Sequence, residues 1–294
     1  MRPYRLAATI LVMLLGIAGA AFAADQSVPG QPLPWQLGLQ AGATPVKHQM
    51  HEFHDLLMVI ITGITVFVLA LIGYVVVRFN AKRNPVPSKT SHNTVIEVIW
   101  TVVPVLILLI IAVPSFRLLY FLDRAENPEM TLKVHGYQWY WGYEYPDQQV
   151  SEFAAYMVPD EELQEGQVRL LSTDNVVVLP VDTDIQILTT AGDVIHSWAV
   201  PSFGVKMDAV PGRINETWVR IEEEGTYYGQ CSEICGTGHG FMPIEVRAVS
   251  REAFDEWVLQ HTDGSDTENP PRLLTMTWEE AMAKRQVAQN AVQQ

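Results

Sequence analysis

The clearest pattern along the chain is a pair of long apolar runs without a charged residue. Residues 56–77 form the first run of 22 residues, and residues 98–116 form the second run of 19. A helix of about 20 apolar residues crosses the hydrocarbon layer of a bilayer. Pro104 and Pro114 interrupt the second run, but neighbouring helices can accommodate such prolines. We therefore predict two membrane-spanning helices.

A basic loop joins the two runs and gives the predicted hairpin a direction. Residues 78–94 contain Lys or Arg at positions 78, 82, 83 and 89. Under the positive-inside rule this loop lies in the cytoplasm, so the outer ends of both helices face outward. Glu97 stands at the cytoplasmic mouth of the second run, where a carboxylate also stabilises a helix N-terminus.

The first residues are typical of an export signal. Arg2 and Arg5 precede an apolar run over residues 10–21, and Ala-Phe-Ala at 21–23 is a typical cleavage site. A first membrane helix is the alternative, but the run is short and small residues close it. We predict a signal peptide over residues 1–23, and the export of the N-terminus agrees with the direction of the hairpin.

Short β-prone segments, separated by Gly, Asp, Asn and Pro, fill much of the second half. Regular short strands with turn residues between them are typical of a β-sandwich or barrel. We predict strands at 130–135, 168–171, 176–180, 185–189, 217–221 and 244–249, followed by a short helix at 251–260.

The whole chain is thereby divided into five parts. They are the signal peptide (1–23), an extended arm rich in Pro and Gly (24–54), the membrane hairpin (55–120), a β-rich domain (121–262) and a polar, helix-prone tail (263–294).

Charge is distributed unevenly between the membrane part and the β-rich part. Residues 1–117 carry 8 Lys or Arg and 4 Asp or Glu, whereas residues 118–294 carry 11 and 29, a net charge of −18. An acidic domain repels phosphate, which argues against nucleic-acid binding. It favours a basic protein partner attracted over long range, although general solubility would also explain the charge.

One short segment, residues 231–242, carries the strongest chemical signal. Cys231, Cys235, His239 and Met242 have the spacing C-x3-C-x3-H-x2-M. Thiolate and thioether ligands suit copper, and a weak Met ligand is typical of electron-transfer copper sites. Two thiolates can bridge two copper ions, which then share one unpaired electron. A second histidine is needed for such a pair, and His196 is the candidate.

Two other interpretations of the cysteines were weighed. A structural zinc site could use both cysteines with His239 and a nearby histidine, but it leaves Met242 without a role. A disulfide between Cys231 and Cys235 is chemically possible in an exported domain. The offsets of His239 and Met242 favour a metal over both.

Longer stretches resemble one known family. Residues 231–243 (CSEICGTGHGFMP) look like the binuclear copper loop of cytochrome c oxidase subunit II, and residues 196–213 (HSWAVPSFGVKMDAVPGR) and 136–146 (GYQWYWGYEYP) match the same family. The resemblance covers roughly residues 48–260. It implies a two-helix transmembrane hairpin followed by an all-β cupredoxin-like sandwich. Gly240 stands where the family often has Ser, at a position that is not a ligand.

The resemblance also assigns the copper ligands residue by residue. They are His196, Cys231, Glu233, Cys235, His239 and Met242. In the family the two thiolates bridge the copper ions, each imidazole binds one of them, and the thioether is a weak ligand. Glu233 corresponds to a residue whose backbone carbonyl ligates copper and whose side chain reaches a magnesium ion shared with subunit I.

Further roles follow from the same resemblance. Trp139 matches the aromatic residue at which electrons enter, with Tyr140 as a second candidate, although an aromatic core and interface belt would also explain this cluster. Glu97 matches a carboxylate at the mouth of a proton path into subunit I. Candidates for an acidic docking patch, each of which could instead be a solvated carboxylate, are Glu144, Asp147, Asp160, Asp174 and Asp193. A contact with subunit I is expected at Lys206, Asp208 and Arg213.

The implied function is electron transfer within a respiratory oxidase. Electrons from cytochrome c reach the binuclear copper and pass to subunit I, which holds the haems and a third copper, reduces O2 to water and pumps protons. The expected partners are cytochrome c, subunit I, subunit III, further subunits and the lipid bilayer. The expected location is the bacterial inner membrane, with the copper domain and both termini on the periplasmic side.

Two other protein classes were compared with this interpretation. A quinol oxidase subunit II would keep the hairpin and the sandwich but would lack the copper ligands. A membrane-anchored copper chaperone or storage protein would use exposed Met-rich or Cys-rich tracts instead of one loop and a distant histidine.

Overall fold

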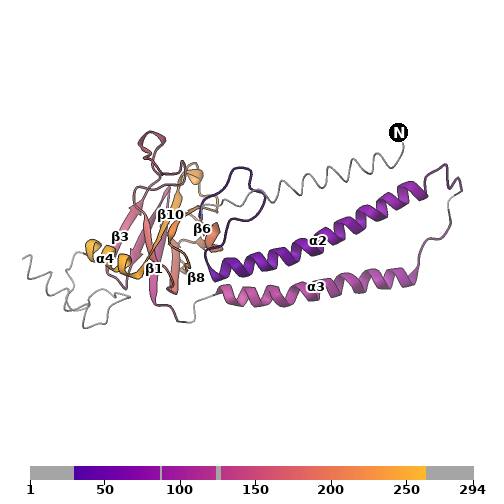
Figure 1. Ribbon diagram of the computed structural model, residues 1–294, viewed down its shortest axis with the longest axis horizontal. Helices are drawn as coiled ribbons and strands as arrows, with labels where there is room; N and C mark the ends of the chain where they lie inside the picture. Colours follow the sequence, from indigo (N-terminus) through magenta and orange to yellow (C-terminus); the bar gives the residue numbers. More distant parts are fainter. Residues whose placement is uncertain (1–29, 87, 124–126, 263–294) are drawn as a thin grey trace, which may run out of the picture. The chain divides into compact units, whose positions relative to one another are not determined.

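A computed structural model describes residues 30–86, 88–123 and 127–262 (Figure 1). The predicted signal peptide and the predicted tail lie outside these residues. The described residues form two compact units. One is a pair of long helices, and the other is a β-rich domain that includes residues 30–44.

The helical unit consists of α2 (Pro45–Arg78) and α3 (Thr94–Asp123), which pack against each other as a hairpin. Both helices are long and apolar enough to cross a membrane. The side chain of Asn93 accepts hydrogen bonds from the backbone N–H groups of Val95 and Ile96, which caps the start of α3.

Helix α2 begins at Pro45, well before the apolar run. Residues 45–54, which the sequence predicted to be part of the extended arm, are therefore helical. The physical reason is that a helix need not end where the hydrocarbon layer ends, and proline is well suited to the first turn because its φ angle is already helical. The polar residues from Lys47 to Asp55 continue the same helix into the apolar run.

Ten strands form the β-rich domain within residues 127–262. They are β1 (Met130–Tyr137), β2 (Tyr140–Tyr145), β3 (Val150–Ala155), β4 (Val177–Pro180), β5 (Ile185–Ala191), β6 (His196–Val200), β7 (Val205–Ala209), β8 (Asn215–Val219), β9 (Gly225–Gln230) and β10 (Pro243–Val249). The domain also contains three short 3-10 helices, Asp160–Glu162, Pro201–Phe203 and His239–Phe241, and the helix α4 (Arg251–His261).

These strands form a sandwich built from three sheets. One sheet has the order β3-β2-β1-β5-β8, a second has the order β4-β10-β9, and β6 pairs with β7 alone. Strand β1 is parallel to β5, and β10 is parallel to β4. Strand β6 also packs against β9, which brings together segments that are far apart in the sequence.

The core lies between the sheets and is rich in aromatic side chains. Alternate residues of β1, such as Leu132 and Val134, are fully buried, while the residues between them face outward. Trp141, Trp198 and Tyr227 are among the largest fully buried side chains. This alternation with a period of two is the expected pattern of a half-buried strand.

Five of the six predicted strands are present with shifted ends, and one prediction is wrong. Residues 168–171 form a turn, in which Leu170 has a positive φ of 64°. The hydroxyl of Ser172 accepts a hydrogen bond from Val168 N, and Ser172 N donates to Val168 O. These local bonds satisfy backbone groups that a strand would have paired elsewhere.

The described part of the arm packs along the β-rich domain. Tyr228 N donates to Gly30 O, Ala43 N donates to Ser202 O, and Glu222 N donates to Ala43 O. The arm is therefore fixed at both of its described ends by backbone hydrogen bonds.

Candidate metal centre

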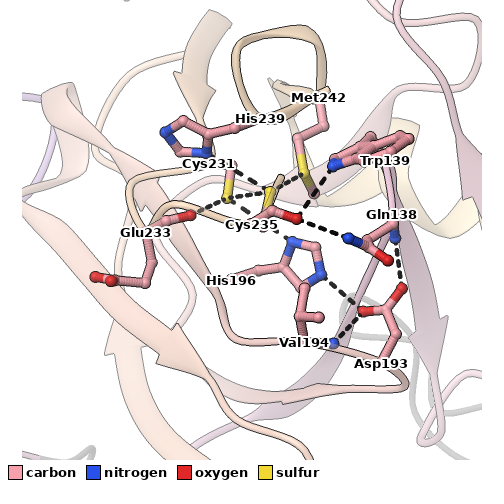
Figure 2. A network of polar contacts seen from close by, with 10 residues as sticks. All are labelled: Gln138, Trp139, Asp193, Val194, His196, Cys231, Glu233, Cys235, His239 and Met242. Carbon is pink, nitrogen blue, oxygen red and sulfur yellow. Dashed lines mark hydrogen bonds and ion pairs between the residues drawn. The ribbon is translucent and has the colours of Figure 1, made fainter. Parts of the chain in front are cut away.

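Two segments position the predicted ligands (Figure 2). His196 is the first residue of β6, and the loop from Cys231 to Met242 joins β9 to β10. The loop is held in place by its backbone, because Cys231 N donates to Met242 O at 3.4 Å and Ser232 N donates to Ser197 O at 2.9 Å. The second bond connects the loop to the strand that carries His196.

The side chains of the loop converge with His196 on one buried point (Figure 2). Cys231 Sγ lies 3.9 Å from Cys235 Sγ and 3.9 Å from His196 Nδ1. Cys235 Sγ lies 3.6 Å from both His239 Nδ1 and Met242 Sδ. The backbone oxygen of Glu233 lies 3.3 Å from Cys231 Sγ.

These distances fit a metal centre. Ligand atoms that bind one metal at about 2.0–2.3 Å lie roughly 3–4 Å from one another. The ligand atoms of His196, Cys231 and Cys235 all lie within 4.8 Å of one another, and within the described ranges no other group of three His, Cys, Asp or Glu residues meets this condition. The two sulfur atoms are almost twice the length of a disulfide bond apart, so both cysteines are free thiols.

Asp193 orients His196 from the side opposite the sulfur atoms. Asp193 Oδ1 lies 2.9 Å from His196 Nε2, while His196 Nδ1 faces Cys231. Carboxylates commonly hold metal-binding histidines in this way, which fixes the ring and its tautomer. Gly136 packs on the other side of the ring, where an added Cβ would lie 2.7 Å from His196 Cδ2. Neither contact could be predicted from the sequence.

The two thiols of the cluster differ in their electrostatics. Burial raises the pKa of the Cys231 thiol, but its contacts with His196 and with neighbouring backbone groups outweigh burial and bring that pKa down to about 7. Burial and the charge of Cys231 raise the pKa of Cys235. Burial also acts to raise the pKa of Asp193, but the hydrogen bonds that it accepts lower it below 3.8, so Asp193 remains ionised beside the ligand.

Gln138 and Trp139 form the turn between β1 and β2 and contact the metal loop (Figure 2). Trp139 Nε1 donates to Cys235 O at 3.3 Å, and Gln138 Nε2 donates to the same oxygen at 2.8 Å. Gln138 N also donates to Asp193 Oδ2 at 2.7 Å. The Trp139 ring rests on Gly238, where an added Cβ would lie 2.4 Å from the ring.

Trp141 is a second aromatic residue at the site, and sequence reasoning gave it no role of its own. It is fully buried, donates from Nε1 to Met242 O at 3.2 Å, and meets the His196 ring edge-on at 5.9 Å between centroids. Its position two residues after Trp139 in β2 was the only available signal, because alternate residues of a strand share a face.

The five acids proposed for docking are all engaged within the domain. Asp193 holds His196, as described above. The other four have the following partners: Glu144 pairs with Lys133 at 3.1 Å, Asp147 accepts from Thr131 N at 2.7 Å, Asp160 pairs with Arg169 at 2.7 Å, and Asp174 accepts from Tyr156 N at 2.7 Å. An acidic residue can hold a local hydrogen bond and still contribute to the field outside the domain.

The remaining predicted residues belong to other elements of the structure. Tyr140 stacks between Tyr137 and Tyr156 on the outer face of the sheet. Glu97 is exposed in the first turn of α3, in the helical unit. Three exposed residues on β7 and the turn after it line a common pocket of about 360 Å³: Lys206, Asp208 and Arg213.

Comparisons with known proteins agree along most of the chain. A family model described as cytochrome C oxidase subunit II, periplasmic domain, matches residues 130–249, and one described as the transmembrane domain of the same subunit matches residues 32–118. A probable cytochrome c oxidase subunit 2 of Rickettsia felis is 51% identical over 263 residues, which cover 90% of this chain and 82% of the relative.

Relatives outside the bacteria and solved structures match as well. Cytochrome c oxidase subunit 2 of Arabidopsis thaliana is 49% identical over 231 residues, covering 76% of this chain and 89% of the relative. The crystal structure of the periplasmic domain of subunit II of cytochrome oxidase of Bradyrhizobium japonicum is 47% identical and covers 46% of this chain and 94% of that chain, with a TM-score of 0.43.

Proposed function

Because the chain belongs to the cytochrome c oxidase subunit II family, we propose that its buried cluster binds two copper ions and accepts electrons from cytochrome c. The chain is a membrane protein and a subunit of a haem-copper terminal oxidase. One observation carries the proposal. The two cysteine sulfur atoms lie within 3.9 Å of each other, and each lies within 3.9 Å of a donor atom of His196, His239 or Met242.

The donor set favours copper over zinc. Thiolate and thioether sulfur are soft ligands, and a weak Met ligand is typical of electron-transfer copper centres. Met242 is 1% exposed and its sulfur faces Cys235, so the thioether is part of the cluster. The residues that would hold the copper ions are Cys231 and Cys235 through their thiolates, His196 and His239 through their imidazoles, Met242 through its thioether and Glu233 through its carbonyl.

When bound, a thiolate-bridged copper pair supplies a redox centre that gains or loses one electron with its charge spread over two metals. The chain contributes rigidity to that centre. His196 is wholly buried and held by Asp193, and Cys231 and Cys235 are 6% and 4% exposed. A water-excluded site made of fixed groups needs little reorganisation when its charge changes.

Trp139 is proposed to link the surface to the copper ligands. Its indole N–H donates to the carbonyl of Cys235, so one hydrogen bond separates this partly exposed ring from the backbone of a ligand. The acidic domain would attract the lysine-rich face of a basic donor over long range. Glu144, Asp147, Asp160 and Asp174 are proposed to contribute to this attraction mainly through their charge, since their local hydrogen bonds and ion pairs leave the net charge of the domain negative.

Further parts of the proposal concern the complex and its orientation. The side chain of Glu233 is proposed to reach a magnesium ion shared with subunit I, and Glu97 to lie at the mouth of a proton path. The exposed β7 residues Lys206 and Asp208, with Arg213, are proposed to contact subunit I. The positive charge of loop 78–94 supports a cytoplasmic position for this loop. The outer ends of both helices, and with them the copper domain, would then lie on the periplasmic side. Subunit III and the bilayer complete the proposed surroundings.

Metal analysis combined with a donor assay tests the proposed function. The full chain, purified in detergent and loaded with copper, should hold two copper ions and be reduced by reduced cytochrome c. His196→Asn should fold, retain less copper and lose this reduction, while Glu256→Gln, which removes an exposed charge on α4 outside the proposed docking acids, should behave as the unaltered chain. One tightly bound zinc ion, or no reduction by cytochrome c, would contradict the proposal.

A further inference from the structure

The outer face of the five-stranded sheet carries a polar cluster next to the turn that holds Trp139. Glu152 on β3 accepts a hydrogen bond from the hydroxyl of Tyr137 at 3.1 Å, and its other oxygen lies 2.5 Å from His135 Nδ1. Both partners are on β1. Because β2 lies between β1 and β3, Glu152 reaches across an entire strand to make these contacts.

A glycine in the intervening strand makes this reach possible. Gly142 pairs with His135 in the β1–β2 ladder. An added Cβ at Gly142 would lie 2.4 Å from Glu152 Oε1 and 3.1 Å from the Tyr137 ring. On the far side of that ring, an added Cβ at Gly192 would lie 2.7 Å from Tyr137 Cε1. The ring of Tyr137 therefore occupies a slot between two glycines, and Glu152 bonds its hydroxyl.

Tyr137 forms the last pair of the β1–β2 ladder before the turn. It pairs with Tyr140, and the two rings are stacked with centroids 4.8 Å apart and an interplanar angle of 15°. Tyr156, just after β3, stacks on Tyr140 at 4.6 Å. Glu152 of β3 thus holds Tyr137, and Tyr156, the residue after β3, holds Tyr140.

Two other segments hold the turn itself, Gln138 and Trp139. Asp193, between β5 and β6, accepts a hydrogen bond from Gln138 N, and the carbonyl of Cys235 in the metal loop accepts from the side chains of Gln138 and Trp139. The position of the turn consequently depends on these two segments and on the Tyr137–Tyr140 pair.

We propose that Glu152 is a positioning residue for electron transfer: through Tyr137 it fixes the Gln138–Trp139 turn against the carbonyl of Cys235. This role rests on the proposed function, since it matters only if electrons pass through Trp139.

One further observation supports this role. Burial, followed by the hydrogen bond to Glu152 and its negative charge, raises the pKa of Tyr137 to about 12, so the phenol remains a donor throughout the physiological range. The side chains of His135 and Glu152 are 25% and 35% exposed, much like those of the neighbouring pair Lys133 and Glu144 at 37% and 29%. The two sites therefore have similar access to water.

A matched pair of variants tests the inference. Glu152→Ala removes the carboxylate that bonds Tyr137. Glu144→Ala removes a carboxylate of the same charge from the same sheet, where Glu144 pairs with Lys133. Both variants remove one negative charge, and Glu144 is also one of the proposed docking acids. A change in the half-saturating donor concentration therefore reports on docking, whereas a difference between the limiting rates reports on the position of the turn.

Two measurements are needed, one of which does not require copper. In the copper-loaded full chain, stopped-flow mixing with reduced cytochrome c gives the limiting rate of reduction and the donor concentration at half that rate. In the metal-free chain, hydrogen exchange of the backbone amides from Gln138 to Trp141 reports how firmly the turn is held.

Glu152→Ala is expected to lower the limiting rate by between about threefold and a hundredfold relative to Glu144→Ala, because a misplacement of about 1 Å can cost on the order of 10²-fold. The half-saturating donor concentration and the copper absorption spectrum should match those of Glu144→Ala, and the turn amides should exchange faster. Glu152→Gln keeps an oxygen that can accept from Tyr137 and should restore most of the rate. Tyr137→Phe should cause a similar loss that is not additive with Glu152→Ala.

Equal limiting rates and equal amide exchange in Glu152→Ala and Glu144→Ala would overturn the inference. Failure of the unaltered chain to be reduced by cytochrome c would instead contradict the proposed function. The amide exchange of the metal-free chain would still decide whether Glu152 holds the turn.

Discussion

The Nε2 atom of His196 lies 2.9 Å from Oδ1 of Asp193, while Nδ1 of the same ring faces Cys231 Sγ at 3.9 Å. The ring therefore has one nitrogen for a metal and one for a carboxylate. The same carboxylate accepts hydrogen bonds from the N–H groups of Gln138 and Val194. One aspartate thus connects His196, the proposed metal ligand, to the turn that carries Trp139.

Asp193→Ala should weaken copper binding without preventing folding. Loss of a carboxylate that orients a metal-binding histidine typically costs 10–100-fold in metal affinity. Competition with a chelator of known affinity measures this change in the full chain. Asp160→Ala, which removes an acid paired with the exposed Arg169, is the control. Copper affinity equal to that of the control would show that Asp193 does not support His196.

Gly136→Ala should disturb the centre through sterics alone. The added Cβ would lie 2.7 Å from Cδ2, 2.9 Å from Cγ and 3.0 Å from Cβ of His196. Because the close contacts include Cγ and Cβ, rotation of the imidazole ring alone cannot relieve them. Overpacking of this kind costs about 1–3 kcal/mol. Denaturant unfolding and copper titration should both register the change. Gly240→Ala meets nothing within 4 Å and should have little effect on either, and equal effects would contradict the steric account.

Trp139→Ala should separate electron transfer from copper binding. The indole donates to the backbone carbonyl of Cys235 and supplies no proposed ligand atom, so the copper absorption spectrum should be retained. Reduction by cytochrome c should slow by on the order of tenfold or more, since the proposed path loses its contact. Stopped-flow kinetics measure this rate, and an unchanged rate would remove Trp139 from the path.

Glu245 should make the domain less stable at neutral pH than at acidic pH. Burial raises its pKa above 4.5, and the hydrogen bond from Thr173 N and the charge of Arg247 only partly oppose this shift. The folded state therefore binds the proton more tightly than the unfolded state. The proton on Glu245 therefore stabilises the folded state. This stabilisation is complete below about pH 4.5 and is lost as the pH rises through the pKa of Glu245 in the folded state.

The substitution Glu245→Gln tests this dependence, because the amide keeps an oxygen for Thr173 N and removes the charge. Its thermal midpoint should exceed that of the unaltered chain at pH 7, and the difference should shrink near pH 4. Glu256→Gln, on the exposed face of α4, should show no such change. A lower midpoint for Glu245→Gln at pH 7 would contradict the burial argument.

The membrane helices and the metal loop could be read from the sequence because both signals are local. Uninterrupted apolar runs define the helices, and Cys231, Cys235, His239 and Met242 lie within one loop. His196 required the assumption that a neighbouring strand meets the loop, and the structure brings its ring to 3.9 Å from Cys231.

Other features depend on contacts between distant segments and could not be read in this way. Gln138 bonds Asp193 and Cys235, which lie 55 and 97 positions away in the sequence. Asp193 was grouped with the docking acids because an isolated Asp in a loop is usually solvated, whereas here three hydrogen-bonding groups surround it. Glu152 gave no signal, because its role depends on the absence of a side chain at Gly142 in the next strand.

Electron paramagnetic resonance of the copper-loaded full chain tests the central claim most directly. Two copper nuclei that share one electron through bridging thiolates should give a seven-line hyperfine pattern, and His196→Asn should abolish it. A four-line pattern from a single copper ion would contradict a binuclear centre at Cys231 and Cys235.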